Sequence, residues 1–97
     1  LGLELQQAEI AVQEAEERLR VSAKSVEQAE ESARINRLRF KEGVLLTADL
    51  IAVENRLTEA MVRRTVAETA QRIALADLRR ALGLPQFDAD PTAGAAQ

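Results

Sequence analysis

The 97-residue sequence contains no cysteine, histidine, tryptophan or tyrosine, and only two phenylalanines. Without cysteine or histidine the chain cannot form a disulfide framework, a zinc finger or a nucleophilic site that uses a histidine base. The remaining carboxylates suit only hard cations, so we predict no metal site and no cofactor. No run of 18 or more apolar residues is present, and no segment resembles a signal peptide. Because the chain opens with Leu1 rather than methionine, we expect it to be a piece of a longer protein.

Alanine makes up much of the apolar content, with 18 residues of 97. An alanine buries far less area than a leucine, so the composition favours long, closely packed helices over a globular core. Glycine and proline are sparse, and Gly43 and Gly83 mark off two uninterrupted stretches of roughly 40 residues each. The sequence therefore predicts two long helices.

The first stretch carries an unbroken pattern of apolar or small residues at intervals of three and four. The larger register holds Leu5, Val12, Leu19, Val26, Ala33 and Phe40, and the smaller holds Ala8, Ala15, Ser22, Ala29 and Asn36. This period predicts a left-handed coiled coil, and the small register lets two helices approach closely. The predicted fold class is all-α, an antiparallel coiled-coil helical hairpin of two long helices.

The second stretch repeats this pattern. Its small register holds Ala60, Ala67, Ala74 and Ala81, its large register holds Leu50, Leu57 and Leu78, and Arg64 and Gln71 interrupt it. Core packing is also the default expectation for the apolar side chains of Phe40 and Met61. Further apolar residues lie off the pattern, namely Ile10, Ile35, Leu38, Val66, Ala70 and Ile73. A hairpin buries only its facing stripes, so these residues predict further helical neighbours, and a four-helix dimer for the isolated chain.

The turn between the helices is predicted at Gly43, a suitable left-handed residue for closing a helix. The predicted hairpin of residues 1–83 has a helix at 3–42, a turn at 43–46 and a helix at 47–82, and residues 84–97 are predicted to be disordered. We expect the Thr47 hydroxyl to cap the second helix, with Asp49 at the favourable end of its dipole. Such a short connection gives an antiparallel rod of about 55 to 60 Å.

Charged residues predict solvated faces, with acid-before-base pairs four residues apart such as Glu16 with Arg20 and Glu30 with Arg34. The net charge is −3. One basic cluster, made of Arg34, Arg37, Arg39 and Lys41, suits either a phosphate-binding patch or a helix end that complements the dipole. The acidic balance and the lack of stacking aromatics favour the helix end, so we predict no nucleic acid partner. The carboxylates point in different directions from a helix, and we predict no catalytic residues and no enzyme activity.

The sequence around the predicted turn is more specific. It reads Arg39-Phe40-Lys41-Glu42-Gly43-Val44-Leu45-Leu46-Thr47-Ala48-Asp49-Leu50-Ile51, and the second stretch closes with Ala81-Leu82-Gly83. The arginine, the aromatic residue, the glycine, the acid and the final Ala-Leu-Gly occur in an order and spacing that resemble the second periplasmic hairpin of TolC-like outer membrane efflux proteins. Arg39, Phe40 and Gly83 are the motif residues of this resemblance. It covers roughly residues 3 to 84.

Two positions depart from the family pattern. The family often has serine or threonine three residues after the glycine, where this chain has Leu46 and places its hydroxyl at Thr47. The family's Asp-Ala-Gln trio is Ala52-Val53-Glu54 here, so a second acid is missing and Asp49 alone remains as the candidate pore-constriction acid.

The resemblance implies a homotrimer in which each protomer contributes two such hairpins to a tapering α-barrel. It places the chain at the cell outer membrane, in the periplasmic portion of an efflux conduit for transmembrane transport. Gly43, Val44, Leu45, Leu46 and Thr47 would form the tip that docks a periplasmic adaptor protein, with an inner-membrane pump as the further partner. Two alternatives stay open. One is a helical spacer or oligomerisation module, and the other is the hairpin of a periplasmic adaptor itself.

Overall fold

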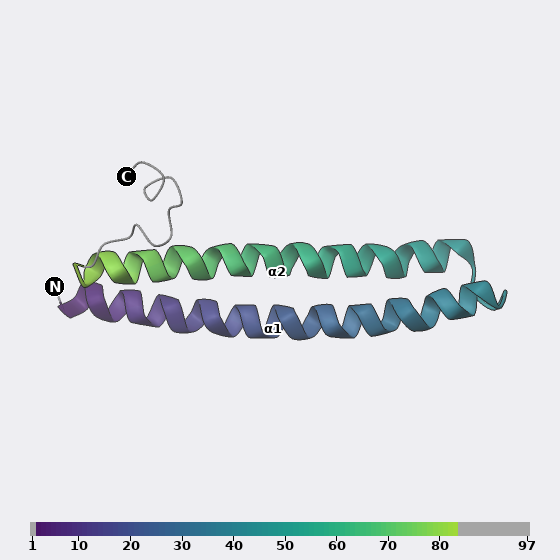
Figure 1. The fold of residues 1–97 in the computed structure, drawn as a ribbon, viewed down its shortest axis with the longest axis horizontal. Coiled ribbons are helices and arrows are strands. Elements are labelled where there is room, and N and C mark those ends of the chain that lie inside the picture. Colours follow the sequence, from purple (N-terminus) through teal and green to yellow (C-terminus); the bar gives the residue numbers. More distant parts are fainter. Residues whose placement is uncertain (1, 84–97) are drawn as a thin grey trace, which may run out of the picture.

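The computed structural model describes residues 2–83, which form two long helices joined by a short turn. Helix α1 spans Gly2–Lys41 and helix α2 spans Thr47–Ala81. The helices run antiparallel and side by side, with the turn at one end of the rod and both outer helix ends at the other (Figure 1). The longest dimension is 61 Å. The predicted all-α hairpin is therefore confirmed, and the described residues contain no strand.

The observed helix boundaries differ slightly from the predicted ones. Helix α1 begins and ends one residue earlier than the predicted 3–42, and α2 ends one residue earlier than the predicted 47–82. The predicted disorder of 84–97 lies outside the described residues. Charges complement both helix dipoles, since Glu4 and Asp49 lie in the first turns while Arg39 and Lys41 lie in the last turn of α1.

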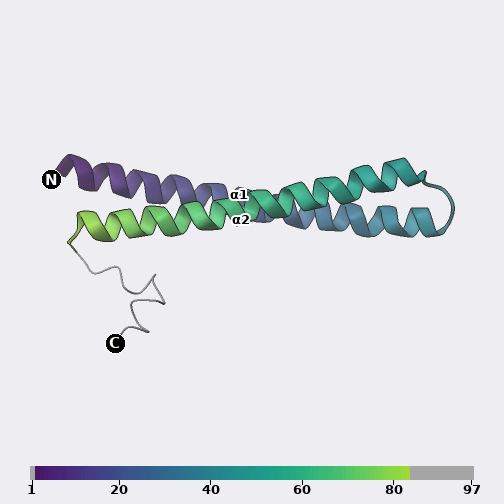
Figure 2. The ribbon, with the colours of Figure 1, turned by 90° about the horizontal axis from the view of Figure 1, so that it is seen from above.

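The helices meet along a buried line that we call the seam. It consists of Val12, Ala15, Ser22, Val26 and Ala33 from α1, and Val53, Leu57, Ala60, Ala67 and Ala74 from α2. Every α1 member was predicted from the heptad pattern, and six of the ten residues are alanine or serine. Ala33 is completely buried, in a cluster with Val53 and Leu57. Seen from above, the helices cross once near the middle of the rod (Figure 2), which is the geometry that small residues at close contact allow.

Three expectations about the seam need correction. Val53 belongs to it although the heptad reading began the small register at Ala60, seven residues later. Core packing was wrong for Phe40 and Met61, whose side chains are 40% and 44% exposed. Phe40 lies in the last turn of α1, where its side chain lines an open hollow together with Leu50 of α2 and does not enter the seam. Met61 follows Ala60 directly and therefore points away from the seam.

The polar residues in or near the seam find partners locally. The Ser22 hydroxyl is buried and donates a hydrogen bond of 2.9 Å to the carbonyl oxygen of Leu19. Arg64, which interrupts the large register, points outward and pairs with Glu68 at 3.7 Å. No buried side-chain nitrogen or oxygen among the described residues lacks a hydrogen-bond partner.

Most ion pairs lie on the exposed faces at a spacing of three residues. Arg20 pairs with Glu17 rather than with the predicted Glu16, and Arg34 pairs with Glu31 rather than Glu30. In both cases a bidentate contact forms one helical turn back, which matches the planar guanidinium to both carboxylate oxygens. Each arginine thereby lowers the pKa of its glutamate, chiefly through the hydrogen bonds.

Candidate functional site

The turn end of the rod, residues 43–47, is the candidate site, and we call it the tip. Helix α1 is closed there by two backbone hydrogen bonds. The Gly43 N–H donates to the Phe40 carbonyl oxygen at 3.0 Å, and the Val44 N–H donates to the Arg39 carbonyl oxygen at 2.9 Å. This is the Schellman arrangement, which requires a left-handed residue just past the helix. Gly43 has a φ of +80°, as the sequence predicted.

Helix α2 begins without a side-chain cap. Leu46 occupies the N-cap position with an extended backbone, and its carbonyl oxygen accepts hydrogen bonds from the Asp49 and Leu50 N–H groups, both at 3.1 Å. Thr47 is already the first helical residue, so the predicted capping role of its hydroxyl is wrong. The hydroxyl lies one residue too late in the chain, because an N-cap residue needs the extended backbone that Leu46 adopts.

The side chains of the tip are apolar and face solvent. Val44 is 70% exposed and Leu46 is 72% exposed, which are the two largest exposed fractions among the large hydrophobic residues of the described chain. Leu45 between them is half-buried. Because exposed aliphatic side chains of this size gain free energy when a partner covers them, the tip is suited to docking.

A hollow of about 660 Å³ lies beside the tip. Its apolar lining comes from Leu38, Phe40 and Leu50, and its basic lining comes from Arg34, Arg37 and Lys41. The surface next to the tip is therefore apolar with a positive rim.

One interhelical ion pair joins the two helices close to the tip. The Arg37 Nε and Nη2 atoms donate to the Glu54 Oε2 and Oε1 atoms, both at 2.7 Å. These hydrogen bonds lower the pKa of Glu54 below its ordinary value of 4.5 and raise the pKa of Arg37. The pair is bidentate and joins residues 17 apart in sequence, so it follows from the register that the seam sets between α1 and α2. Both side chains are exposed, so the pair itself adds little to stability.

The other predicted site residues divide between the two ends of the rod. Arg39 and Phe40 lie at the tip, where their carbonyl oxygens close α1. Asp49 is exposed in the first turn of α2, where the positive end of the helix dipole stabilises its carboxylate. Gly83, with a φ of +75°, ends α2 at the opposite end of the rod (Figure 1). The structure thus brings together every predicted site residue except Gly83.

Reasoning from the sequence missed two features of this end. The Arg37–Glu54 pair was not predicted, because spacing within one helix cannot reveal a partner on another helix. Its signal appears only once the helices are aligned by their small registers. The exposure of Phe40 was missed because the heptad pattern continues to the end of α1 and does not show how far the partner helix covers its last turn.

Two further kinds of site were sought among the described residues, a metal site and a membrane-spanning helix. They contain no group of three or more acidic, cysteine or histidine side chains placed to hold a metal ion. Neither described helix combines the length and the apolar character needed to cross a membrane. Comparisons of the chain with protein-family models, with curated proteins and with solved structures found no match.

Proposed function

We propose that this chain is a periplasmic hairpin of an outer membrane efflux conduit, and that its tip docks a periplasmic adaptor of a tripartite pump. The observation that carries the proposal is the tip itself, a glycine-closed turn that presents Val44 and Leu46 to solvent. The spacing from Gly43 to Asp49 and the closing Ala81-Leu82-Gly83 add the resemblance to TolC-like proteins. In this proposal the chain is part of a homotrimer at the outer membrane and has no enzymatic role.

The proposed mechanism is passive. The pump in the inner membrane supplies the energy, and the conduit opens by small helix shifts that a seam of small residues permits. Covering Val44 and Leu46 with apolar side chains of the adaptor would stabilise the docked state by up to about 1.5–3 kcal/mol for each side chain fully buried. Charge at the tip is mixed, because the bases Arg39 and Lys41 lie beside the acids Glu42 and Asp49, so the apolar side chains carry the proposed contact.

The bland alternative is a spacer or oligomerisation hairpin. Its support is the seam, which would hold two helices together whatever the tip does. A spacer has no need for two exposed aliphatic side chains in its turn, where polar residues would give a more soluble end. The tip is therefore the feature that distinguishes the two functions.

A binding experiment separates them. The partner would be the helical hairpin of the adaptor encoded beside the parent gene, and affinity would be measured by calorimetry. We expect the double variant Val44→Ser with Leu46→Ser to bind at least about tenfold more weakly, because it removes the apolar area that the partner would cover. The matched control is Leu3→Ser with Ile10→Ser, since these residues are comparably exposed but lie toward the opposite end of the rod. Equal affinity of the wild type and the tip variant would reject docking at the tip.

Asp49 supplies a second test in the full protein. A ring of three such carboxylates would favour cations near the mouth of the conduit, as charged rings do in other pores. Asp49→Asn should therefore reduce cation block and cation selectivity in single-channel recordings. Unchanged conductance and block would remove Asp49 from the constriction.

A further inference from the structure

One side of the hairpin forms a long groove between the helices, which we call the small-residue groove. It comprises three hollows of about 310, 600 and 370 Å³. The first two share Ser25 and Arg63, so they are continuous. Along the whole groove the lining residues recur every seven positions. They are Glu4, Ala11, Arg18, Ser25 and Ser32 on α1, and Arg56, Arg63, Ala70 and Asp77 on α2.

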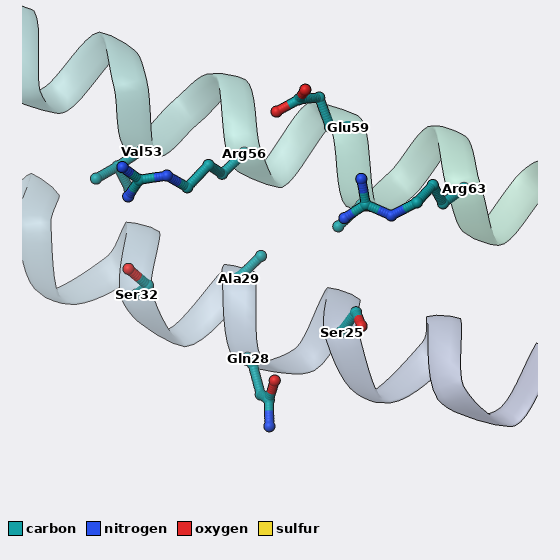
Figure 3. A pocket seen from close by; sticks show the side chains of 9 residues that line it. Ser25, Gln28, Ala29, Ser32, Val53, Arg56, Glu59 and Arg63 are labelled. Atoms are coloured by element: carbon teal, nitrogen blue, oxygen red, sulfur yellow. The ribbon is translucent and has the colours of Figure 1, made fainter.

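The groove exists because α1 contributes small side chains along this side. In the part nearer the tip, Ser25, Ala29 and Ser32 of α1 face α2, and the Arg56 and Arg63 side chains reach from α2 toward them (Figure 3). In the middle, Val21, Val62 and Val66 are exposed at the rims. The groove is thus apolar at its centre and has charged residues spaced along it.

The net charges at its two ends have opposite sign. At the open end of the rod Glu4 and Asp77 outnumber Arg80, whereas nearer the tip Arg56 and Arg63 outnumber Glu59. Arg39 follows Ser32 in the heptad register of α1, one heptad beyond the lining residues. The midpoint of the groove lies between residues 21 and 22 of α1 and between residues 66 and 67 of α2. All four of these residues line the same hollow. The α1 midpoint is also the middle of Gly2–Lys41.

When a second copy of the groove is turned end for end about that midpoint and placed against the first, oppositely charged residues face one another. Glu4 falls opposite Arg39 of the reversed copy, and Asp77 falls opposite Arg56 of that copy. Asp77 uses its Oδ1 atom for Arg80, which leaves Oδ2 for a second donor. The two arginines nearer the middle fall opposite small residues, Arg18 opposite Ser25 and Arg63 opposite Ala70, so their stems have room.

We propose that the small-residue groove binds a second copy of this chain, face to face and reversed, so that the two tips lie at opposite ends of a four-helix bundle. The alternative two-fold pairing, with both tips at the same end, would gather the basic halves together and the acidic ends together. Like charges at those contacts disfavour it. Charge therefore selects the reversed orientation.

The available area suffices for a stable dimer. A face 61 Å long and about 15 Å wide, which is the separation of about 8–10 Å between the helix axes plus about half a helix radius on each side, covers on the order of 900 Å² per copy. Stable interfaces bury about 800 Å² per partner. The inference concerns the isolated hairpin and does not rest on the efflux proposal, in which all tips of the homotrimer lie at one end and the reversed pairing does not occur.

Cysteine crosslinking tests the orientation. Because the sequence contains no native cysteine, any disulfide forms at the introduced position. In the reversed dimer Val21 lies next to its own copy on the two-fold axis, and so does Val66, so Val21→Cys alone and Val66→Cys alone should each form disulfide-linked dimers on mild oxidation. Both side chains are exposed, so the hairpin should tolerate the changes. Ile73→Cys is the matched control. Its two copies would lie about 20 Å apart at 1.5 Å rise per residue, beyond disulfide reach.

Charge reversal tests the pairing independently. Sedimentation equilibrium should show wild-type dimers, and Glu4→Arg or Arg39→Glu alone should weaken dimerisation about tenfold, since each change acts twice in a two-fold dimer. Combining the two should restore the wild-type affinity to within about twofold, because the pair is then inverted but intact. Three results would each overturn the proposal: a wild-type monomer up to millimolar concentration, crosslinking of Ile73→Cys as readily as of Val21→Cys, or no recovery in the double variant.

Discussion

Ala33 gives the sharpest test of the packing between the helices. Its side chain is completely buried against Val53 and Leu57, so a leucine there has no space unless the helices move apart. Forcing extra methylene groups into a filled contact costs about 1–3 kcal/mol. For a chain of this size, about 4–8 °C of melting temperature corresponds to each kcal/mol. Ala33→Leu should therefore lower the melting temperature by about 5 to 20 °C, although leucine is the more hydrophobic residue.

The assay is thermal unfolding followed by circular dichroism at 222 nm, at one fixed protein concentration because self-association raises the midpoint. Ala52→Leu is the matched control, since Ala52 is an exposed residue within α2 and receives the same added atoms. It should change stability by less than about 0.5 kcal/mol. If Ala33→Leu were neutral or stabilising while the control behaved as expected, the close approach of the helices at this alanine would be refuted.

Four further changes have defined outcomes. Ser22→Ala should stabilise the hairpin by about 0.5 kcal/mol in urea unfolding, because the lost hydroxyl bonds only within its own helix; a clear loss of stability would mean that the hydroxyl has another partner. Gly43→Ala should cost about 1–2 kcal/mol despite open space around it, because its φ is +80°, and an unchanged midpoint would contradict the left-handed turn. Leu46→Ser should stabilise α2 by about 0.5–1 kcal/mol through a new N-cap and should weaken adaptor binding. A rise or a fall of stability and adaptor affinity together would contradict this expectation. Because Arg37 lowers the pKa of Glu54, that carboxylate stabilises the fold fully above its ordinary 4.5 and loses this effect as the pH falls through the lower folded value; Glu54→Gln should accordingly flatten the acid limb of stability against pH.

The seam could be predicted because its physical cause is periodic. Ala15 and Ala33 recur at heptad spacing with their neighbours, and this pattern is expected where a second helix packs closely against the first. Gly43 could be predicted because few residues other than glycine adopt the left-handed conformation that closes a helix.

The features that escaped prediction depend on the relative placement of the two helices. Phe40 is exposed in the last turn of α1, and the heptad pattern of that helix does not show how far α2 covers it. The pairing of Arg37 with Glu54 requires the register to be known first. Arg20 selects Glu17 over Glu16 through bidentate geometry that residue spacing alone does not rank.

The tip, the groove and the proposed dimer all require that the chain reverse at Gly43 and close on its small residues. Spin labels on cysteines replacing Gln13 and Arg72, which are exposed residues of α1 and α2, measure this directly by pulsed electron resonance in protein diluted with unlabelled chain. Antiparallel helices packed at about 8–10 Å predict a narrow distribution below about 25 Å once the label arms are included. A distance near 90 Å, which a single continuous helix at 1.5 Å rise per residue would give, would contradict the hairpin.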